Sequence, residues 1–164
     1  MAIRDALTTD PVITRRVESE RLVFPGLQGF YDALAPYMYP LFRFTVGAML
    51  VPHGYFKFLN GAAKFAPGLA KMGLEPALLF AYVVIFLELV GGACVAIGLF
   101  TRPLAAALAV EFAVITFGVH LPQGWYMGQH GGEYPFMWGI FFFCIALRGA
   151  GTLSVDRSIL GKEI

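Results

Sequence analysis

Seven ionisable residues lie inside apolar stretches of the chain or at their ends, where charged side chains are rare and costly. They are Arg43, His53, Lys57, Glu88, Glu111, His120 and Glu133. Imidazole, ammonium and carboxyl groups can donate hydrogen bonds and exchange protons in such surroundings. These residues are therefore candidates for a binding pocket or a proton path. The alternative is that they pair only to neutralise one another.

Helical spacing places several of these groups on shared faces. His53 and Lys57 are four residues apart and lie one above the other on a helix, beside a Pro52 that predicts a kink. Small residues mark the inward faces of two later helices, because they allow close helix approach. These faces are Glu88, Gly91, Gly92, Val95 and Leu99 on one helix, and Ala105, Ala109, Ala113, Thr116 and His120 on the next.

The last apolar stretch begins with Glu133, and the expected inward face continues through Met137, Ile140 and Cys144. With alternate helices running in opposite directions, five of the polar residues converge near one end of the bundle. The predicted pocket is lined by His53, Lys57, Glu88, His120 and Glu133, in the outer half of the bundle. It would take a small molecule, a proton or a metal ion.

Glu111 does not fit this arrangement. Nine residues separate it from His120, which is a rotation of about 900° and places the two on opposite faces of an α-helix. Glu111 then faces lipid near the middle of the membrane, unless it pairs with Arg43, is protonated, or is covered by a second subunit. We favour the second subunit, which predicts a homo-oligomer.

The elements that position these residues are four apolar segments. The chain is 58% hydrophobic and 14% charged, with a mean hydropathy of +0.69, whereas soluble domains are about 45–50% apolar and about 25% charged. Segments 37–59, 76–100, 103–121 and 134–147 each approach the roughly 20 residues that span a bilayer. The predicted fold is an all-α, integral membrane bundle of four transmembrane helices, residues 37–164. It follows an N-terminal cytoplasmic and interfacial segment, residues 1–36.

Lysine and arginine outside these segments predict the orientation. Eight lie at the two termini and in the link near residue 102, against three on the opposite side, which are Lys57, Lys64 and Lys71. The protein is therefore expected in a bacterial plasma membrane, with both termini on its cytoplasmic side. The net charge of +1 and the absence of a basic run exclude a nucleic-acid partner.

The ordered motifs resemble those of the DoxX family of small bacterial membrane proteins. LFRFTVGAMLVPHGYFKF contains Arg43, Gly47, His53, Gly54 and Lys57, and LELVGGACVAIGLFTR contains Glu88, Gly98 and Arg102. His120, the run Gly131, Gly132, Glu133, and the closing GAGTLSVD follow in the family's order. The chain departs from the pattern at Glu111, where the family usually has an apolar residue, and in its longer N-terminal segment.

The resemblance implies a membrane subunit of a redox system that binds a quinone, alongside a soluble oxidoreductase subunit. His53, His120 and Lys57 could donate hydrogen bonds to quinone oxygens, and Glu88 could relay protons. The alternatives are a non-catalytic anchor or assembly partner, a small-molecule carrier, and a metal site made of His53, His120, Glu88 and Glu133. The cysteines, Cys94 and Cys144, form no C-x-x-C motif, so thiol chemistry and structural zinc are not indicated.

Overall fold

The structure is a computed structural model, and it describes residues 22–162. Within that range every regular element is helical and no strand is present, so the all-α fold class is confirmed. The main elements are α2 (Gln28–Asn60), α3 (Ala62–Lys71), α4 (Ala77–Phe86), η3 (Leu87–Gly91), α5 (Gly92–Ile97), α6 (Thr101–Val114), η4 (Ile115–His120) and α7 (Glu133–Arg148). Short helical turns are η2 (Pro25–Leu27), η5 (Leu121–Gln123), η6 (Met127–Gln129) and η7 (Asp156–Leu160). The part of the predicted N-terminal segment before residue 22 lies outside the described residues.

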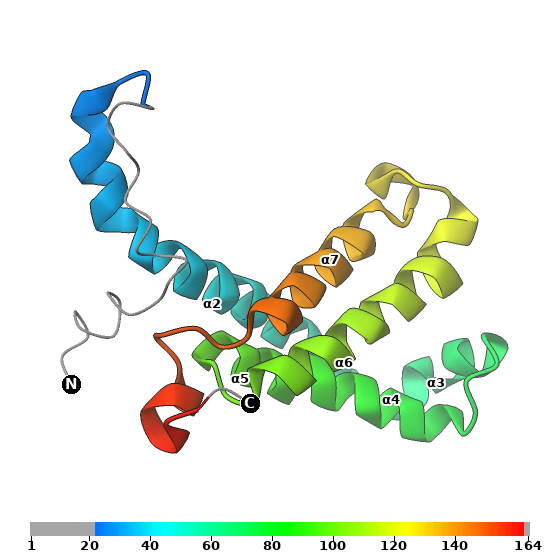
Figure 1. The fold of residues 1–164 in the computed structure, drawn as a ribbon. Helices are drawn as coiled ribbons and strands as arrows, with labels where there is room; N and C mark the ends of the chain where they lie inside the picture. The colour runs from blue at the N-terminus through cyan, green and yellow to red at the C-terminus, as the bar shows by residue number, and fades with distance from the viewer. Residues whose placement is uncertain (1–21, 163–164) are drawn as a thin grey trace.

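Helix α2 is longer than the sequence predicts. It has 33 residues and begins at Gln28, inside the N-terminal segment 1–36 that was expected to precede the first transmembrane helix. Pro36, Pro40 and Pro52 lie inside it. Each proline removes one backbone hydrogen bond and can bend a helix without ending it. The helix is visibly bent, and its N-terminal part projects away from the other helices (Figure 1).

Two glycines allow α2 to lie directly against the second long helix, which consists of α4, η3 and α5. A Cβ atom on Gly47 would lie 2.5 Å from Ala96 N, and one on Gly54 would lie 2.4 Å from Leu89 N. Such contacts are possible only where the side chain is absent. The crossing of α2 with η3 therefore depends on Gly54, which is one helical turn from Lys57.

Helices α6 and α7 pack side by side (Figure 1). Their contact is aromatic, because the rings of Phe112, Trp138 and Phe142 stack with centroids 5.7 to 6.0 Å apart. The buried residues of α7 are Pro135, Trp138, Phe142 and Ile145. The inward face predicted for this helix is wrong, since Met137, Ile140 and Cys144 are exposed. Ring stacking, which helical spacing alone does not reveal, decides which face is buried.

The stretch between α2 and α4 is a helix rather than the expected loop. In α3, Ala62 and Ala66 are buried against Ala77, Ala81 and Ile85 of α4. The two helices lie next to each other in Figure 1. Small side chains on both helices permit this close packing. As a result, α3 lies close to the end of the bundle that contains Lys57.

The surface of the described part is strongly apolar. Large hydrophobic side chains are exposed on α2, α4, α6 and α7, among them Leu41, Leu79, Val110 and Phe143. Two helical stretches, Ala77–Ile97 and Thr101–Gln123, are long and apolar enough to cross a bilayer. They correspond to the second and third predicted segments. Membrane crossing by α2 and α7 remains a prediction.

Candidate functional site

The central polar contact of the molecule joins α2 to η3. Lys57 Nζ lies 2.5 Å from Glu88 Oε1, a hydrogen-bonded ion pair. The Glu88 side chain is 3% exposed and that of Lys57 is 32% exposed. Lys57 therefore connects a buried carboxylate with a more open region. A buried charge is tolerated where such a partner is present.

A cavity of about 240 Å³ opens beside this pair. Its polar lining residues are His53, Lys57, Glu88, His120, His130 and Tyr134. Leu50, Phe112 and Trp138 are among its apolar lining residues. We refer to it as the Lys57–Glu88 cavity. Four of the five predicted pocket residues thus lie around one space.

A second cavity of about 290 Å³ adjoins the first, because Lys57, Ile115 and His120 line both. Its other lining residues come from α3, α4, η4 and the turn after α3, and they are apolar: Phe65, Gly68, Leu69, Met72, Val84 and Val119. We call it the apolar side cavity. The Lys57 ammonium lies 6.0 Å from the Phe65 ring centroid, at the boundary between the two spaces. A polar cavity and an apolar one therefore meet at Lys57 and His120.

His130 is a cavity residue that the sequence did not single out. The Nδ1 atom of His120 lies 2.6 Å from the backbone oxygen of His130, a hydrogen bond that ties η4 to the loop before α7. His130 itself has a left-handed backbone, with φ of 59°. It occurs in a glycine-rich loop outside the apolar segments, where a histidine carries no helical signal. Its position follows from the folding of this loop.

Glu133 lies outside the set of residues that line the cavity. It is exposed at the start of α7, and its Oε2 accepts a hydrogen bond from Met127 N at 3.1 Å. A carboxylate in the first turn of a helix also interacts favourably with the helix dipole. These contacts support a role for Glu133 in holding the 123–133 loop. Its predicted role in ligand binding has no geometric support.

Two π-helical segments, η3 and η4, contain Glu88 and His120 respectively. A π-helical turn accommodates one extra residue, and such turns are frequent at functional sites. The extra residue changes the rotation between Glu111 and His120 from about 900° to about 800°, so the two lie about 80° apart. Both can then face the interior. A uniform α-helix, which the sequence prediction assumed, would have separated them.

Glu111 is buried, at 7% exposure. The prediction that it faces lipid and needs a second subunit to cover it is therefore wrong. It interacts electrostatically with Glu88 and Lys57 across the contact between α6 and η3. The stripe of small residues predicted as the inward face of this helix is only partly buried, since Ala105 and Thr116 are buried but Ala113 is exposed.

Arg43 is also buried, but it does not pair with Glu111. Its guanidinium donates hydrogen bonds to the backbone oxygens of Ala150 and Leu153, the latter at 2.9 Å. Both acceptors belong to the segment after α7, more than 100 residues away in the chain. The predicted ion pair is replaced by a contact that fixes this segment to α2.

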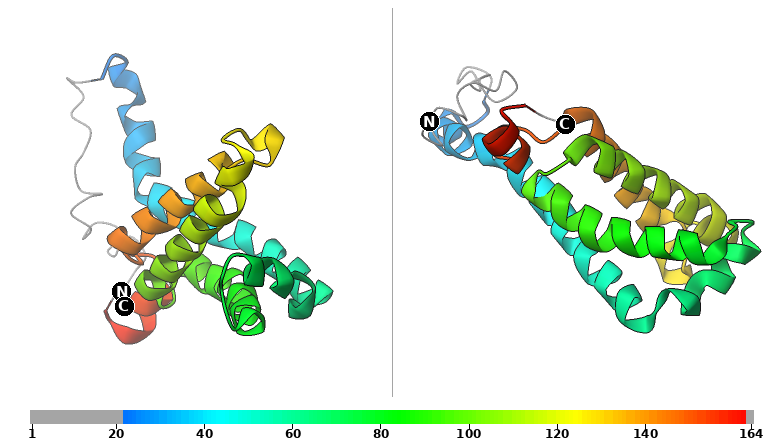
Figure 2. Two further views of the ribbon diagram at one scale, coloured as in Figure 1. Left: turned by 90° about the vertical axis from the view of Figure 1, so that its right-hand side faces the viewer. Right: turned by 90° about the horizontal axis from the view of Figure 1, so that it is seen from below.

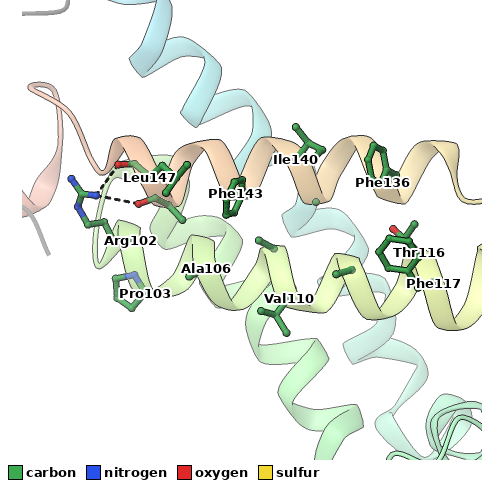
Figure 3. Close-up of a pocket in the computed structure, with 14 residues that line it drawn as sticks. Arg102, Pro103, Ala106, Val110, Thr116, Phe117, Phe136, Ile140, Phe143 and Leu147 are labelled. Atoms are coloured by element: carbon green, nitrogen blue, oxygen red, sulfur yellow. Dashed lines mark hydrogen bonds between the residues drawn. The ribbon is translucent and has the colours of Figure 1, made fainter.

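A larger groove of about 740 Å³ lies between α6 and α7 (Figure 3). Arg102 lies at one end and donates hydrogen bonds to Ala146 O and Leu147 O, at 3.2 and 2.8 Å. Apart from Arg102 and Thr116, its lining residues are nonpolar. It shares no lining residue with the Lys57–Glu88 cavity. A groove of this kind suits a lipid acyl chain rather than a polar ligand.

The described part of the chain contains no group of three histidine, cysteine, aspartate or glutamate side chains placed to hold a metal ion. His53, His120, Glu88 and Glu133, considered above for such a site, are therefore not arranged as one. Cys94 and Cys144 are free.

Comparison with known proteins agrees with the resemblance seen in the sequence. The family model DoxX matches residues 39–121. An uncharacterized protein of Haemophilus influenzae (strain ATCC 51907 / DSM 11121 / KW20 / Rd) is 32% identical over 130 residues, which cover 77% of this chain and 94% of the relative. No solved structure matches the chain. The matched region includes α4 to α6 and the Lys57–Glu88 pair. The chain therefore belongs to the DoxX family of small membrane proteins.

Proposed function

We propose that the protein is a membrane subunit of a redox system and binds a quinone, with the quinone head in the Lys57–Glu88 cavity. The observation that carries the proposal is the junction of a polar cavity with an apolar one at Lys57 and His120. A quinone has the same division, a polar ring and an apolar isoprenoid tail. The tail would begin in the apolar side cavity.

The size and chemistry of the polar cavity support a single ring as its occupant. About 240 Å³ is smaller than the roughly 300–1,000 Å³ of pockets that enclose drug-sized ligands. Lys57 and His53 can donate hydrogen bonds to ring oxygens, and Trp138 is an aromatic residue of the same lining. His120 donates its Nδ1–H to His130 O, so its neutral ring presents Nε2 to the ligand as an acceptor. Polar donors at the edge of an apolar space are what quinone oxygens require.

A carrier function is less well supported. At the opposite end of the molecule the buried charged side chains of Arg43 and Asp156 are bound to the backbone. Asp156 accepts hydrogen bonds from Phe100 N and Thr101 N, and Arg43 binds the carbonyls of the segment after α7. These contacts close that end and leave few groups to form a polar path. An anchor that binds a soluble oxidoreductase without binding quinone is the remaining alternative.

The proposal can be tested through the fluorescence of Trp138. The chain has two tryptophans, so a Trp125→Phe variant reports from Trp138 alone. In lipid nanodiscs, we expect a short-tailed quinone to quench this fluorescence saturably. Glu88→Gln, which weakens the ion pair, should lower the affinity about tenfold, the effect of about 1.4 kcal/mol.

Two matched controls are available outside the cavity. Lys64→Met removes an exposed lysine whose bond within residues 22–162 is to Asn60, and Glu75→Gln alters a carboxylate at the start of α4. Both should leave the quenching unchanged.

Leu69→Trp, which narrows the apolar side cavity and adds its own fluorescence, is assayed instead by isotope-labelled quinone binding. It should weaken binding of an isoprenoid quinone but not of a tail-free one. Quenching that does not saturate, or is equal in Glu88→Gln, would rule out the site and favour the anchor.

A further inference from the structure

Glu111 is a second buried carboxyl group beside the ion pair, and the proposed quinone site makes no use of it. It lies on α6, which packs against η3, and it is not among the residues that line the Lys57–Glu88 cavity. Its carboxyl group interacts electrostatically with the carboxyl group of Glu88 and with the ammonium group of Lys57. Lys57, Glu88 and Glu111 therefore form a small cluster at the wall of the cavity, in which both carboxyl groups are buried.

The cluster lacks hydrogen-bond donors. Glu88 Oε1 receives one from Lys57. Glu88 Oε2 and both carboxyl oxygens of Glu111 are buried and find no donor among the described residues. Buried polar atoms are rarely left in this state. If one of the two carboxyl groups carries a proton, its O–H supplies a donor to the other.

The charge balance leads to the same conclusion. Two ionised carboxylates and one ammonium would leave a net negative charge in an apolar interior, which is unfavourable. The other titratable groups around this region are His53 on α2, His120 on η4, His130 in the loop and Tyr134 on α7, and all four lie on the cavity side. Among the described residues, no salt bridge other than that with Lys57 reaches either carboxyl group. One proton makes the cluster neutral.

We infer that Glu88 and Glu111 hold one proton between them, with Lys57 balancing the remaining negative charge, and that this pair is a proton-binding site in the wall of the cavity. Glu88 lines the cavity and Glu111 lies behind it. A proton leaving the pair therefore passes through Glu88. Its O–H bond breaks, a bond forms to a basic atom of the ligand, and the second carboxylate is left in the cluster.

The protonation of the pair does not depend on the identity of the ligand. Delivery of the proton to a quinone rests on the function proposed above. The two can fail separately, because the proton is detectable in the protein without ligand.

The test is infrared spectroscopy of the full chain, labelled with ¹³C-glutamate, in a detergent without ester carbonyls. The carbonyl band of a protonated carboxyl group is distinct from carboxylate bands, and the isotope shift assigns it to glutamate. At neutral pH we expect one such band in the wild-type protein. It should disappear in Glu111→Gln, because Glu88 then has Lys57 as its sole partner.

Two further variants separate a shared proton from one held by Glu111 alone. In Glu88→Gln, a shared proton is lost because Glu111 takes Lys57 as its countercharge, so the band disappears. A band that persists in this variant shows that Glu111 is protonated independently and overturns the inference. In Lys57→Met the band should double in intensity. Glu133→Gln, at an exposed carboxylate, should leave it unchanged.

Absence of the band from the wild-type protein would also overturn the inference. Circular dichroism and size-exclusion chromatography of each variant establish that it is folded before its spectrum is interpreted. If the bands behave as described while quinone fails to quench Trp138, the proton site stands and the quinone proposal falls.

Discussion

Asp156 shows how a single buried carboxylate can hold two distant parts of the chain. It is fully buried, and its two oxygens accept hydrogen bonds from Phe100 N at 3.0 Å and Thr101 N at 3.3 Å. Its own backbone N–H donates to Gly98 O at 2.9 Å. The start of a helix has N–H groups without partners in the helix. Asp156 supplies acceptors for two such groups at the start of α6.

We therefore predict that Asp156→Ala destabilises the protein by about 2 kcal/mol or more, because it leaves buried N–H groups without acceptors. Asp156→Asn, which keeps one side-chain oxygen, should have a smaller effect. Thermal unfolding in detergent measures both. Asp32→Ala, at an exposed position of α2, is the matched control and should leave the melting temperature unchanged. Equal melting temperatures for Asp156→Ala and this control would show that the contact contributes nothing.

Gly98 lies in the same region, near the end of the LELVGGACVAIGLFTR motif, and its backbone conformation explains why a glycine occurs there. It has φ of 77°, a left-handed conformation that favours glycine. A Cβ atom there would lie 2.6 Å from the Ser154 Cβ and 2.8 Å from the Arg43 guanidinium carbon. The motifs that contain Arg43, Gly98 and Ser154 are far apart in the sequence but meet at one point around Arg43. At this point their residues hold the fold together.

At the scale of the helices, the spacing between α2 and η3 controls the ion pair. Gly54 lies one turn before Lys57, and its Cα faces the backbone of Leu89, next to Glu88. A side chain at this position would push the two helices apart. The distance of 2.5 Å between Lys57 and Glu88 would then no longer be possible without rearrangement.

Gly54→Ala is accordingly expected to destabilise the protein by about 1–3 kcal/mol, the usual cost of overpacking, and to abolish saturable quinone quenching. Gly29→Ala lies on the same helix with nothing within 4 Å of the added Cβ. This control should be neutral or slightly stabilising, since alanine favours helix formation. Thermal unfolding and the Trp138 assay report the two effects. If Gly54→Ala matches Gly29→Ala in both, close approach of the helices is not required.

The π-helical segments were the main feature of the helices that the sequence could not provide. A prediction that uses a fixed rotation of about 100° per residue assigns residues to the correct face of a helix only while that helix stays α-helical. Within η4 one additional residue per turn changes the phase, and the same applies around Glu88 in η3. Such turns form where packing across helices favours them, which is a property of the assembled bundle.

At the scale of the whole molecule, the two ends of the bundle differ in chemistry. One end contains Arg43, Arg102 and Asp156, which bind backbone groups and fix the segment after α7. In Figure 2 this C-terminal segment, drawn in red, lies beside the green junction of α5 and α6, to which Asp156 N is bonded through Gly98 O. The other end contains the histidines, the Lys57–Glu88 cavity and α3 with its lysines.

The excess of lysine and arginine at the first end predicts that it faces the cytoplasm. A reporter enzyme that is active only outside the cytoplasm should be inactive when fused after Ile164. The same reporter inserted after Trp125 should be active. Fusions to a cytoplasmic fluorescent reporter at the same two sites provide the reciprocal control. Activity after Ile164 would reverse the orientation and place the cavity on the cytoplasmic side.

The sequence by itself determined the helical fold class, the limits of α4 to α7 to within a few residues, and the polar residues of the cavity on α2, η3 and η4. Hydropathy and close glycine spacing are local properties, and they carry this information directly. It also indicated the membrane class, which the family comparison supports.

Tertiary structure alone decided the partners of these residues. Arg43 binds carbonyls about 110 residues away, and a π-helical turn lets His120 share the interior side with Glu111. Glu133 holds a loop, and His130 joins the cavity from outside the helices. Each of these contacts depends on how helices cross and on where a loop returns to the bundle. Those arrangements minimise the free energy of the whole bundle, and a periodic pattern along one helix does not contain them.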